Sequence, residues 1–309
     1  MKIVLLFNPR SGGAARRSEV EGLGASLRAG GHEVELAEVG GPPLLDLLRG
    51  AGLLVVAGGD GTLHHSLNAA SRAGVPVYHW PLGTENLFAR QFGMTRSATA
   101  LARAIDAGRV VEVDLGACDD RPFAIMCSVG PDAAVIHRMH ATRKGSIRRT
   151  TYLGPIWREL AEPPARLRVW VDGDLAVDGQ RGMVVVANGC NYGFGFNPAA
   201  MAAMDDGLLD CVFLPADSAW GALWWLCKAR VGRHVRDPRL VYRTGREIVV
   251  ANAGDAPALA QCDGEATGTL ACGGGAGCAV QLVVRQRALK VLTVAPGQGA
   301  ARGAGRDRR

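Results

Sequence analysis

Short runs rich in apolar residues alternate with amphipathic segments along the first third of the chain. The runs are 2–7 (KIVLLF), 32–39 (HEVELAEV), 53–57 (LLVVA) and 75–80 (VPVYHW), and their length is typical of strands. Between them, apolar residues recur at helical spacing, as at Val20, Leu23 and Leu27, before glycines end the segment. The alternation predicts a doubly wound α/β domain with a parallel sheet over residues 1–114. Its ligands would bind beyond the carboxyl ends of the strands.

From residue 115 onward, strand patterns follow one another with few helices between them. Leu167, Val169 and Val171 alternate with polar residues up to a turn at Asp172-Gly173, which is typical of a hairpin. The other expected strands are 183–188, 208–214, 240–244, 247–252, 259–265 and 278–284. We therefore predict an antiparallel β-sandwich domain over 115–287, interrupted by a helix at about 218–231. Residues 288–295 are expected to form a strand that returns to the first domain, and 296–309 a disordered basic tail.

Composition and charge narrow the class of protein. The chain has 309 residues, 48% of them hydrophobic and 21% charged, which is enough apolar material for folded domains. The formal net charge is +6, from 35 Lys and Arg against 29 Asp and Glu. Much of this excess lies in residues 138–149, which hold five basic residues and no acid, and in the C-terminal tail. Because a nucleic-acid-binding domain normally carries a broader basic face, no nucleic-acid partner is expected.

The cysteines and apolar segments give no sign of secretion or membrane insertion. Eight cysteines are scattered without a CxxC pair, so neither a zinc site nor a disulfide framework is indicated. The N-terminal apolar run is too short for a signal peptide. The stretch around Trp220–Cys227 falls short of the roughly 20 apolar residues that a membrane span needs. We expect a soluble, cytoplasmic protein, in which Trp220, Trp224 and Trp225 pack in the core or between the domains.

Three glycine-containing loops follow strands of the predicted parallel sheet. Residues 58–62 (GGDGT) come after the third strand and open a helix, where glycines let backbone N–H groups approach an anion. Residues 8–13 (NPRSGG) follow the first strand, and 81–86 (PLGTEN) follow the fourth. In a parallel sheet the three loops converge on one edge, which predicts a phosphate cradle. Neither GxxxxGK[ST] nor GxGxxG occurs, so this cradle is not a standard P-loop or dinucleotide fingerprint.

An ordered set of motifs resembles the catalytic-domain family of diacylglycerol kinases, with its bacterial lipid kinase, sphingosine kinase and ceramide kinase relatives. The motifs are NPRSGG (8–13), VVAGGDGTLHHSLNA (55–69), PLGTENLFAR (81–90), SVGPDAAV (128–135), NGCNYGFGFNPAAMAAMDDGLLD (188–210) and CDGE (262–265). The likeness spans roughly residues 2–294. It implies an α/β nucleotide-binding domain, a β-sandwich domain and an active site in the cleft.

The resemblance assigns roles to individual residues. It implies that Glu265 is the general base, which accepts the proton of a lipid hydroxyl as its oxygen attacks the γ-phosphate of ATP. Asp263 would orient Glu265 or act through a metal, and Asp60 is the essential acid of the nucleotide loop. The residues expected to contact the nucleotide are Asn8, Ser11, Gly12, Gly58, Gly59, Asp60, Gly61, Thr62, Gly83, Thr84 and Asn86. The implied cofactors are ATP and Mg²⁺.

A structural Mg²⁺ site is implied for the segment AAMDDGLLD (202–210). Asp206 matches a family position that binds the ion together with two backbone carbonyls, here those of Ala203 and Leu208. One carboxylate with carbonyls and waters suits a hard cation, whereas an Asp-Gly turn without an ion stays an open alternative. Glu85 departs from the family pattern, which commonly has a small residue there, and a carboxylate beside phosphates is electrostatically unfavourable.

A lipid substrate implies access to a membrane surface. The basic segment with Arg143, Lys144, Arg148 and Arg149 is the candidate for contact with an anionic surface at the inner face of the membrane. A solvated helix face is the ordinary alternative for such a charge run. The oligomeric state stays open, with a homodimer as one option.

The favoured function is that of an ATP-dependent lipid kinase for a diacylglycerol-like or sphingoid-like acceptor. Two alternatives remain at this stage. A soluble-substrate kinase resembling NAD kinases would share the GGDGT loop, and a non-catalytic lipid or nucleotide sensor would bind without turnover. The order of PLGTEN and a later DGE favours the lipid kinase over the first. Retention of Asp60 and Glu265 argues against the second.

Overall fold

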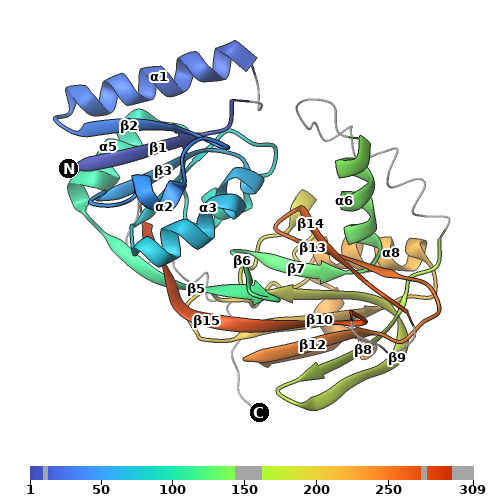
Figure 1. Cartoon of the computed structure of the whole chain (residues 1–309). Coiled ribbons are helices and arrows are strands. Elements are labelled where there is room, and N and C mark those ends of the chain that lie inside the picture. The colour runs from blue at the N-terminus through green and yellow to red at the C-terminus, as the bar shows by residue number, and fades with distance from the viewer. Residues whose placement is uncertain (10–12, 143–161, 273–276, 294–309) are drawn as a thin grey trace. The chain divides into compact units, whose positions relative to one another are not determined.

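A computed structural model of the chain describes residues 1–9, 13–142, 162–272 and 277–293 (Figure 1). The chain divides into two compact units. Of the described residues, unit 1 holds 1–9, 13–114 and 286–293, and unit 2 holds 115–142, 162–272 and 277–285. The expected contact residues Ser11 and Gly12, the basic segment at 143–149 and the tail at 296–309 lie outside the described residues.

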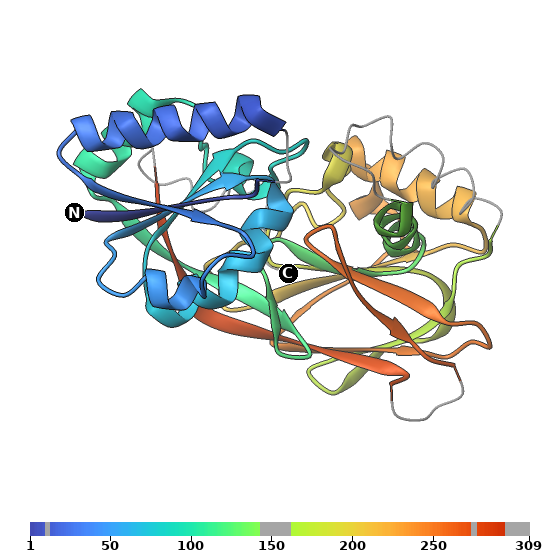
Figure 2. The same cartoon turned by 45° about the horizontal axis from the view of Figure 1, so that its top comes forward.

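Unit 1 alternates strands and helices along the chain. Its elements are β1 (Lys2–Phe7), α1 (Gly13–Ala29), β2 (Glu33–Glu38), α2 (Leu44–Leu47), β3 (Leu53–Gly58), α3 (Asp60–Ala73), β4 (Val77–Pro81), α4 (Leu87–Gln91) and α5 (Ala98–Ala107). The strands form a parallel sheet in the order β2-β1-β3-β4. Helices α1 and α5 lie on one face of this sheet and α2 and α3 on the other (Figures 1 and 2). The predicted doubly wound parallel sheet is confirmed.

The burial of the unit 1 strands follows from this double covering. β3 is buried along its whole length, and β1 is buried except at Lys2. A strand covered by helices on both faces has no side for polar residues, which explains the continuous apolar runs. α3 is amphipathic, with Leu63, Leu67 and Ala70 buried, and it ends at Gly74 in the left-handed conformation (φ 63°).

Unit 2 is dominated by antiparallel strands. Its strands are β6 (Arg121–Phe123), β7 (Met126–Val129), β8 (Arg166–Val171), β9 (Asp174–Ala187), β10 (Leu209–Pro215), β11 (Val241–Gly245), β12 (Glu247–Asn252), β13 (Ala258–Cys262) and β14 (Glu265–Leu270). Among the described residues, its helical elements are α6 (Pro131–Thr142), α8 (Ala219–Arg230) and the short 3₁₀ turns η2 (Gly193–Gly195) and η3 (His234–Arg236). The helix α6 directly after SVG was not anticipated, because PDAAVIHR lacks a clear apolar stripe.

The unit 2 strands form two sheets that share β9. One sheet runs β14-β13-β7-β9-β10-β11, and the other contains β9, β8 and β12. Buried residues of both sheets make one apolar core, including Phe123, Val169, Val186, Phe213 and Ile248. The predicted antiparallel β-sandwich is confirmed.

Two strands run across the boundary between the units. β5 (Val110–Cys118) and β15 (Ala279–Leu292) each have residues in both. β15 pairs antiparallel with β12 in unit 2, and its residue Val291 pairs parallel with Val77 of β4 in unit 1. The segments 278–284 and 288–295, which were expected to form two separate strands, therefore lie in one continuous strand as far as Leu292.

The tryptophans of α8 correct one sequence expectation. Trp225 is buried, and its indole N–H donates to the carbonyl of Pro215 at 2.6 Å. Trp220 and Trp224, however, are 53% and 62% exposed, so the prediction that they pack inside the protein was wrong. The helix is apolar on nearly all sides, and in such a helix spacing alone does not reveal which face is covered.

Candidate nucleotide and phosphotransfer site

The GGDGT loop of unit 1 joins a buried strand to the start of a helix. β3 ends at Gly58, Gly59 occupies the N-cap in an extended conformation, and α3 begins at Asp60. The N–H groups of Thr62 and Leu63 both donate to the carbonyl of Gly59, at 3.0 and 3.2 Å. A Cβ at Gly58 would lie 2.5 Å from the Thr62 side chain, so only glycine fits beneath the buried threonine.

The second loop meets the first at two glycines. Gly58 and Pro81 are register partners in the β3–β4 pair, and the N–H of Leu82 donates to the carbonyl of Gly58 at 2.8 Å. A Cβ at Gly83 would lie 2.6 Å from the Cα of Gly59. This backbone contact leaves no room for a Cβ at Gly83, and a Cβ at Gly59 would lie only 3.1 Å from the Cα of Gly83. The loops at 58–62 and 81–86 therefore come together, as their positions after neighbouring strands imply.

Asn86 closes the second loop through its side chain. Its Oδ1 accepts the N–H of Gly83 at 2.8 Å, and its Nδ2 donates to the carbonyl of Gly83 at 2.9 Å. The residue has a positive φ of 48°, which asparagine tolerates better than most residues. This bidentate contact makes Asn86 a loop-forming residue. Thr84 is exposed at the tip.

The other residues of this edge are placed by the sheet. Phe7 pairs with Ala57, so Asn8 follows β1 at the same edge as Gly58. Glu85 is largely buried and lies 3.6 Å from the guanidinium of Arg90, which is half exposed. Arg90 thus gives the Glu85 carboxylate a cationic partner close by in α4.

His79 is a residue of this site that sequence reasoning missed. It is fully buried in β4, and its ring Nε2 lies 3.0 Å from the carbonyl of Gly58. Burial lowers the pKa of His79 from 6.5 to about 4, although the Gly58 contact favours the charged form. The neutral ring then donates from Nε2 and supports the loop from below. The signal in the sequence that could have revealed this residue is a histidine inside an otherwise apolar strand.

The buried ring makes the stability of unit 1 depend on pH. Between pH 6.5 and 4, the unfolded chain binds a proton at His79 that the folded chain excludes, so acid favours unfolding. We expect this residue to remove about 3 kcal/mol of unfolding free energy by pH 4. His79→Gln keeps a donor to Gly58 but does not titrate. Denaturant unfolding of both proteins at pH 7 and pH 4.5 should show a smaller loss in the variant, and equal losses would contradict the assignment.

The DGE segment forms a tight turn in unit 2. Asp263 and Gly264 join β13 to β14, with φ of 51° and 84°, the positive values that a two-residue hairpin of type I′ requires. The Asp263 carboxylate accepts the N–H groups of Ala124, Ile125 and Met126 at 2.7 to 3.1 Å. Glu265 is the first residue of β14 and is partly exposed. The carboxylate of Asp263 thus ties the turn to the start of β7.

Removing this carboxylate should destabilise unit 2. Asp263→Ala leaves three N–H groups without their acceptor, at a cost of about 1–3 kcal/mol for each that stays buried. The free energy of unfolding is expected to fall by at least about 3 kcal/mol. Asp255→Ala, in the preceding loop, is the control and should be close to neutral. Denaturant unfolding measures both, and a wild-type value for Asp263→Ala would mean that water replaces the carboxylate.

A polar network buried beside the turn was also missed. Gln261 accepts the N–H of Gly264 at 2.8 Å, and its amide donates to the hydroxyl of Ser128 at 2.7 Å. The Asp132 carboxylate accepts from Ser128 and from Tyr192, both at 2.5 Å. Burial raises the pKa of Asp132 above its usual range, while these donors oppose the rise. The sequence signal that could have revealed this network is the presence of the polar residues Ser128 and Gln261 inside apolar strands.

The expected Mg²⁺ residues lie in one loop before β10. Asp206 is exposed, and its Oδ1 accepts the N–H of Leu208 at 3.1 Å. Ala203 and Leu208 flank it within the same segment and are partly exposed. An exposed carboxylate with carbonyl oxygens of its own loop is a donor set that fits a hard cation.

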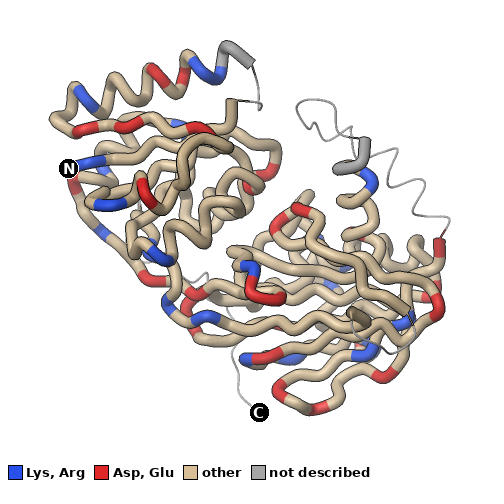
Figure 3. Tube along the Cα trace, viewed as in Figure 1, with Lys and Arg blue, Asp and Glu red and all other residues tan. Residues whose placement is uncertain are grey.

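Charged residues of both signs are interspersed along the described trace (Figure 3). In the described part of the chain, no helix is long and apolar enough to cross a membrane.

The acidic residues of the candidate site are divided between the two units. Asp60 belongs to unit 1, whereas Asp263, Glu265 and Asp206 belong to unit 2.

Two family models match the chain. The diacylglycerol kinase catalytic domain matches residues 2–118, and the YegS C-terminal NAD kinase beta sandwich-like domain matches residues 125–293. The boundary between these matches falls close to the boundary between the units.

Individual relatives agree with the family models. A diacylglycerol kinase of Mycobacterium tuberculosis is 27% identical over 231 residues, which cover 70% of this chain and 74% of the relative. A Pseudomonas aeruginosa protein named probable lipid kinase YegS-like is 32% identical over 174 residues, covering 55% of this chain and 56% of the relative. A crystal structure of a diacylglycerol kinase from Bacillus anthracis has the same fold, with a TM-score of 0.71 at 19% identity, covering 94% of this chain and 96% of that one.

Proposed function

Because the chain belongs to the lipid kinase family that joins a diacylglycerol kinase catalytic domain to a YegS C-terminal domain, we propose that it transfers the γ-phosphoryl group of ATP to a lipid hydroxyl. The observation that carries this proposal is the contact of the two glycine loops at Gly59 and Gly83. Their backbones meet at the carboxyl edge of the sheet beside the start of α3. Backbone N–H groups and a helix N-terminus there favour a polyphosphate.

The nucleotide loops and Asp60 would hold the ATP phosphates. The backbones of 58–62 and 83–86 bind and orient them, with Asn8 at the same edge. When bound, Mg²⁺ neutralises charge that develops on the transferring phosphoryl group. Asp60, at the first position of α3, is the residue of unit 1 suited to hold that ion. Ser11 and Gly12 are proposed contacts from the resemblance alone.

Glu265 is the proposed general base of the transfer. As a carboxylate at the start of β14, it would accept the proton of the attacking lipid hydroxyl. Asp263 acts through the backbone, since its carboxylate is held by three N–H groups and fixes the turn that carries Glu265. A structural Mg²⁺ on Asp206, Ala203 and Leu208 would brace the loop before β10.

The direct test is the identity of the phosphorylated product. The protein is incubated with labelled ATP, Mg²⁺ and either a total lipid extract or NAD, and labelled products are identified by mass. A phosphorylated lipid supports the proposal. Labelled NADP would instead favour a soluble-substrate kinase, and ATP binding without any product over a broad panel of acceptors would favour a sensor.

We further propose that the protein docks on anionic membranes. The described surface suited to this is the outer face of α8 and the turn after it, where Trp220, Trp224, Val231 and Val235 are all more than 40% exposed. The same stretch of sequence is rich in basic residues, among them Arg233 and Arg236, which are exposed. Exposed indole rings next to cations fit the interface of an anionic bilayer. The segment with Arg143, Lys144, Arg148 and Arg149 stays a prediction, as does a homodimer.

Removal of the exposed indole rings should weaken vesicle binding. For Trp220→Ala with Trp224→Ala, we expect at least about a tenfold loss of binding to phosphatidylglycerol-containing vesicles. Leu175→Ala, which removes a side chain that is 52% exposed on the β8–β9 hairpin, is the control. Co-sedimentation measures the binding. Unchanged binding of the double variant, or its conversion from dimer to monomer in light scattering, would assign the face to another partner.

A further inference from the structure

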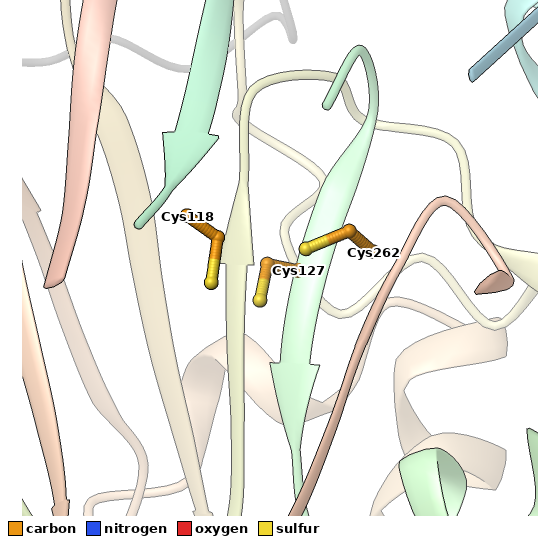
Figure 4. A group of neighbouring side chains, drawn as sticks. All are labelled: Cys118, Cys127 and Cys262. Atoms are coloured by element: carbon orange, nitrogen blue, oxygen red, sulfur yellow. The ribbon is translucent and has the colours of Figure 1, made fainter. Parts of the chain in front are cut away.

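Three cysteines that are far apart in the sequence meet inside the sandwich of unit 2. The sulfur atoms of Cys118, Cys127 and Cys262 all lie within 4.8 Å of one another (Figure 4). All three side chains are buried, with at most 4% exposed. The other cysteines of the described residues do not join this cluster.

The strand pairing explains why the sulfurs converge. Cys127 of β7 and Cys262 of β13 are directly opposite each other. On either side, Gly130 donates its N–H to Leu259 and Asp263 donates its N–H to Met126, at 3.1 and 2.9 Å. Since hydrogen-bonded and non-hydrogen-bonded pairs alternate in antiparallel strands, Cys127 and Cys262 form a non-hydrogen-bonded pair, whose side chains lie closest. Cys118, at the end of β5, completes the triangle.

We infer that Cys118, Cys127 and Cys262 form a three-coordinate site for a soft monovalent metal ion, of the class of Cu(I). Thiolate sulfur selects soft ions such as Cu(I), Zn²⁺ and iron–sulfur clusters. A structural Zn²⁺ site needs four ligands, and no described His, Asp or Glu completes this group. The neighbouring Asp263 carboxylate is occupied by three N–H groups. Three sulfurs without a fourth donor therefore favour the monovalent ion.

The distances fit such an ion. A trigonal ion with metal–sulfur bonds of about 2.3 Å, the length found for Zn–S, would hold the sulfurs about 4 Å apart. The cluster needs only a small contraction to reach that spacing. Because the thiolate is the form of cysteine that binds a metal, the S–H bonds of the coordinating sulfurs break as the ion enters, and their protons leave to solvent.

The test is an anaerobic Cu(I) titration of the full-length, fully reduced protein. Cys227→Ser and Cys272→Ser are introduced first, because these two thiols are exposed and would bind the ion unspecifically. Bicinchoninate competes for Cu(I) and reports the affinity. We expect one Cu(I) per chain, and at least a tenfold weaker affinity when Cys127→Ala is added. Cys211→Ala removes an equally buried cysteine outside the cluster and should leave the affinity unchanged.

A second measurement does not depend on the folding of a core variant. X-ray absorption of the Cu(I)-loaded protein is expected to show three sulfur neighbours. A shell of two sulfurs, or one containing nitrogen or oxygen, would overturn the three-coordinate site. Equal affinity of the Cys127→Ala and Cys211→Ala proteins would overturn it as well.

Discussion

Glu265→Gln is expected to lower lipid phosphorylation by about 10²–10⁴-fold, the usual contribution of a general base. The change keeps the size of the side chain and removes only its ability to accept a proton. Glu265 lies outside the apolar core and follows a turn held by Asp263, so the variant should fold normally. Steady-state turnover with the lipid acceptor identified in the product assay measures the effect.

The kinetic parameter that falls shows whether Glu265 acts as a base or has another role. If it acts as the base, kcat falls while ATP binding and the free energy of unfolding keep their wild-type values. Glu247→Gln removes the charge of a Glu that likewise opens a strand of unit 2, β12, and should keep full turnover. Near wild-type turnover of Glu265→Gln would remove this residue from the mechanism, and an equal loss in the control would point to a general effect of charge.

Gly83→Ala is expected to reduce turnover by about 10²-fold or more, because an error of about 1 Å in substrate positioning has that effect. The new Cβ would lie 2.6 Å from the Cα of Gly59 and 2.8 Å from Oδ1 of Asn86. Neither contact is tolerable, and the first is with backbone. The two loops must therefore separate, and the cradle proposed for the phosphates is lost.

Loss of ATP affinity distinguishes this variant from Glu265→Gln. Isothermal titration with a non-hydrolysable ATP analogue should show much weaker binding by Gly83→Ala. Gly22→Ala in α1 is the control, since no atom lies within 4 Å of its added Cβ, and it should bind and turn over normally. Wild-type affinity of Gly83→Ala would show that the nucleotide does not depend on the contact between the two loops.

Much of the fold could be predicted because its signals are local. The apolar runs of β1 and β3 and the helical spacing in α3 are patterns of nearby residues, and the parallel sheet of unit 1 follows from them. The glycine loops were predictable for the same reason, since each follows a strand. The exposure of Trp220 and Trp224 was not, because a helix that is apolar on most sides does not show which face is covered.

The candidate site, like the fold, could be predicted from the sequence only in part. The motifs pointed to Asp60, Glu265 and Asp263 as candidate site residues, which stays a prediction. They did not reveal that Asp263 is occupied by three backbone N–H groups, or that His79 supports Gly58. Both contacts join segments that are separated along the chain, for which no local pattern exists. A motif therefore indicates the candidate residues, whereas the contacts that hold them in place become visible only in the tertiary structure.

The amino-acid sequence by itself determined the two fold types, the order of the strands and helices in the first unit and the loops that carry the candidate chemistry. It did so because backbone periodicity and glycine placement act over a few residues. Only the tertiary structure decided that Gly59 and Gly83 touch, that Gln261 and Ser128 brace the turn before Glu265, and that three scattered cysteines form one cluster. These contacts depend on strand register and packing, which in unit 2 bring together residues more than 100 positions apart, as in the pairing of Cys127 with Cys262.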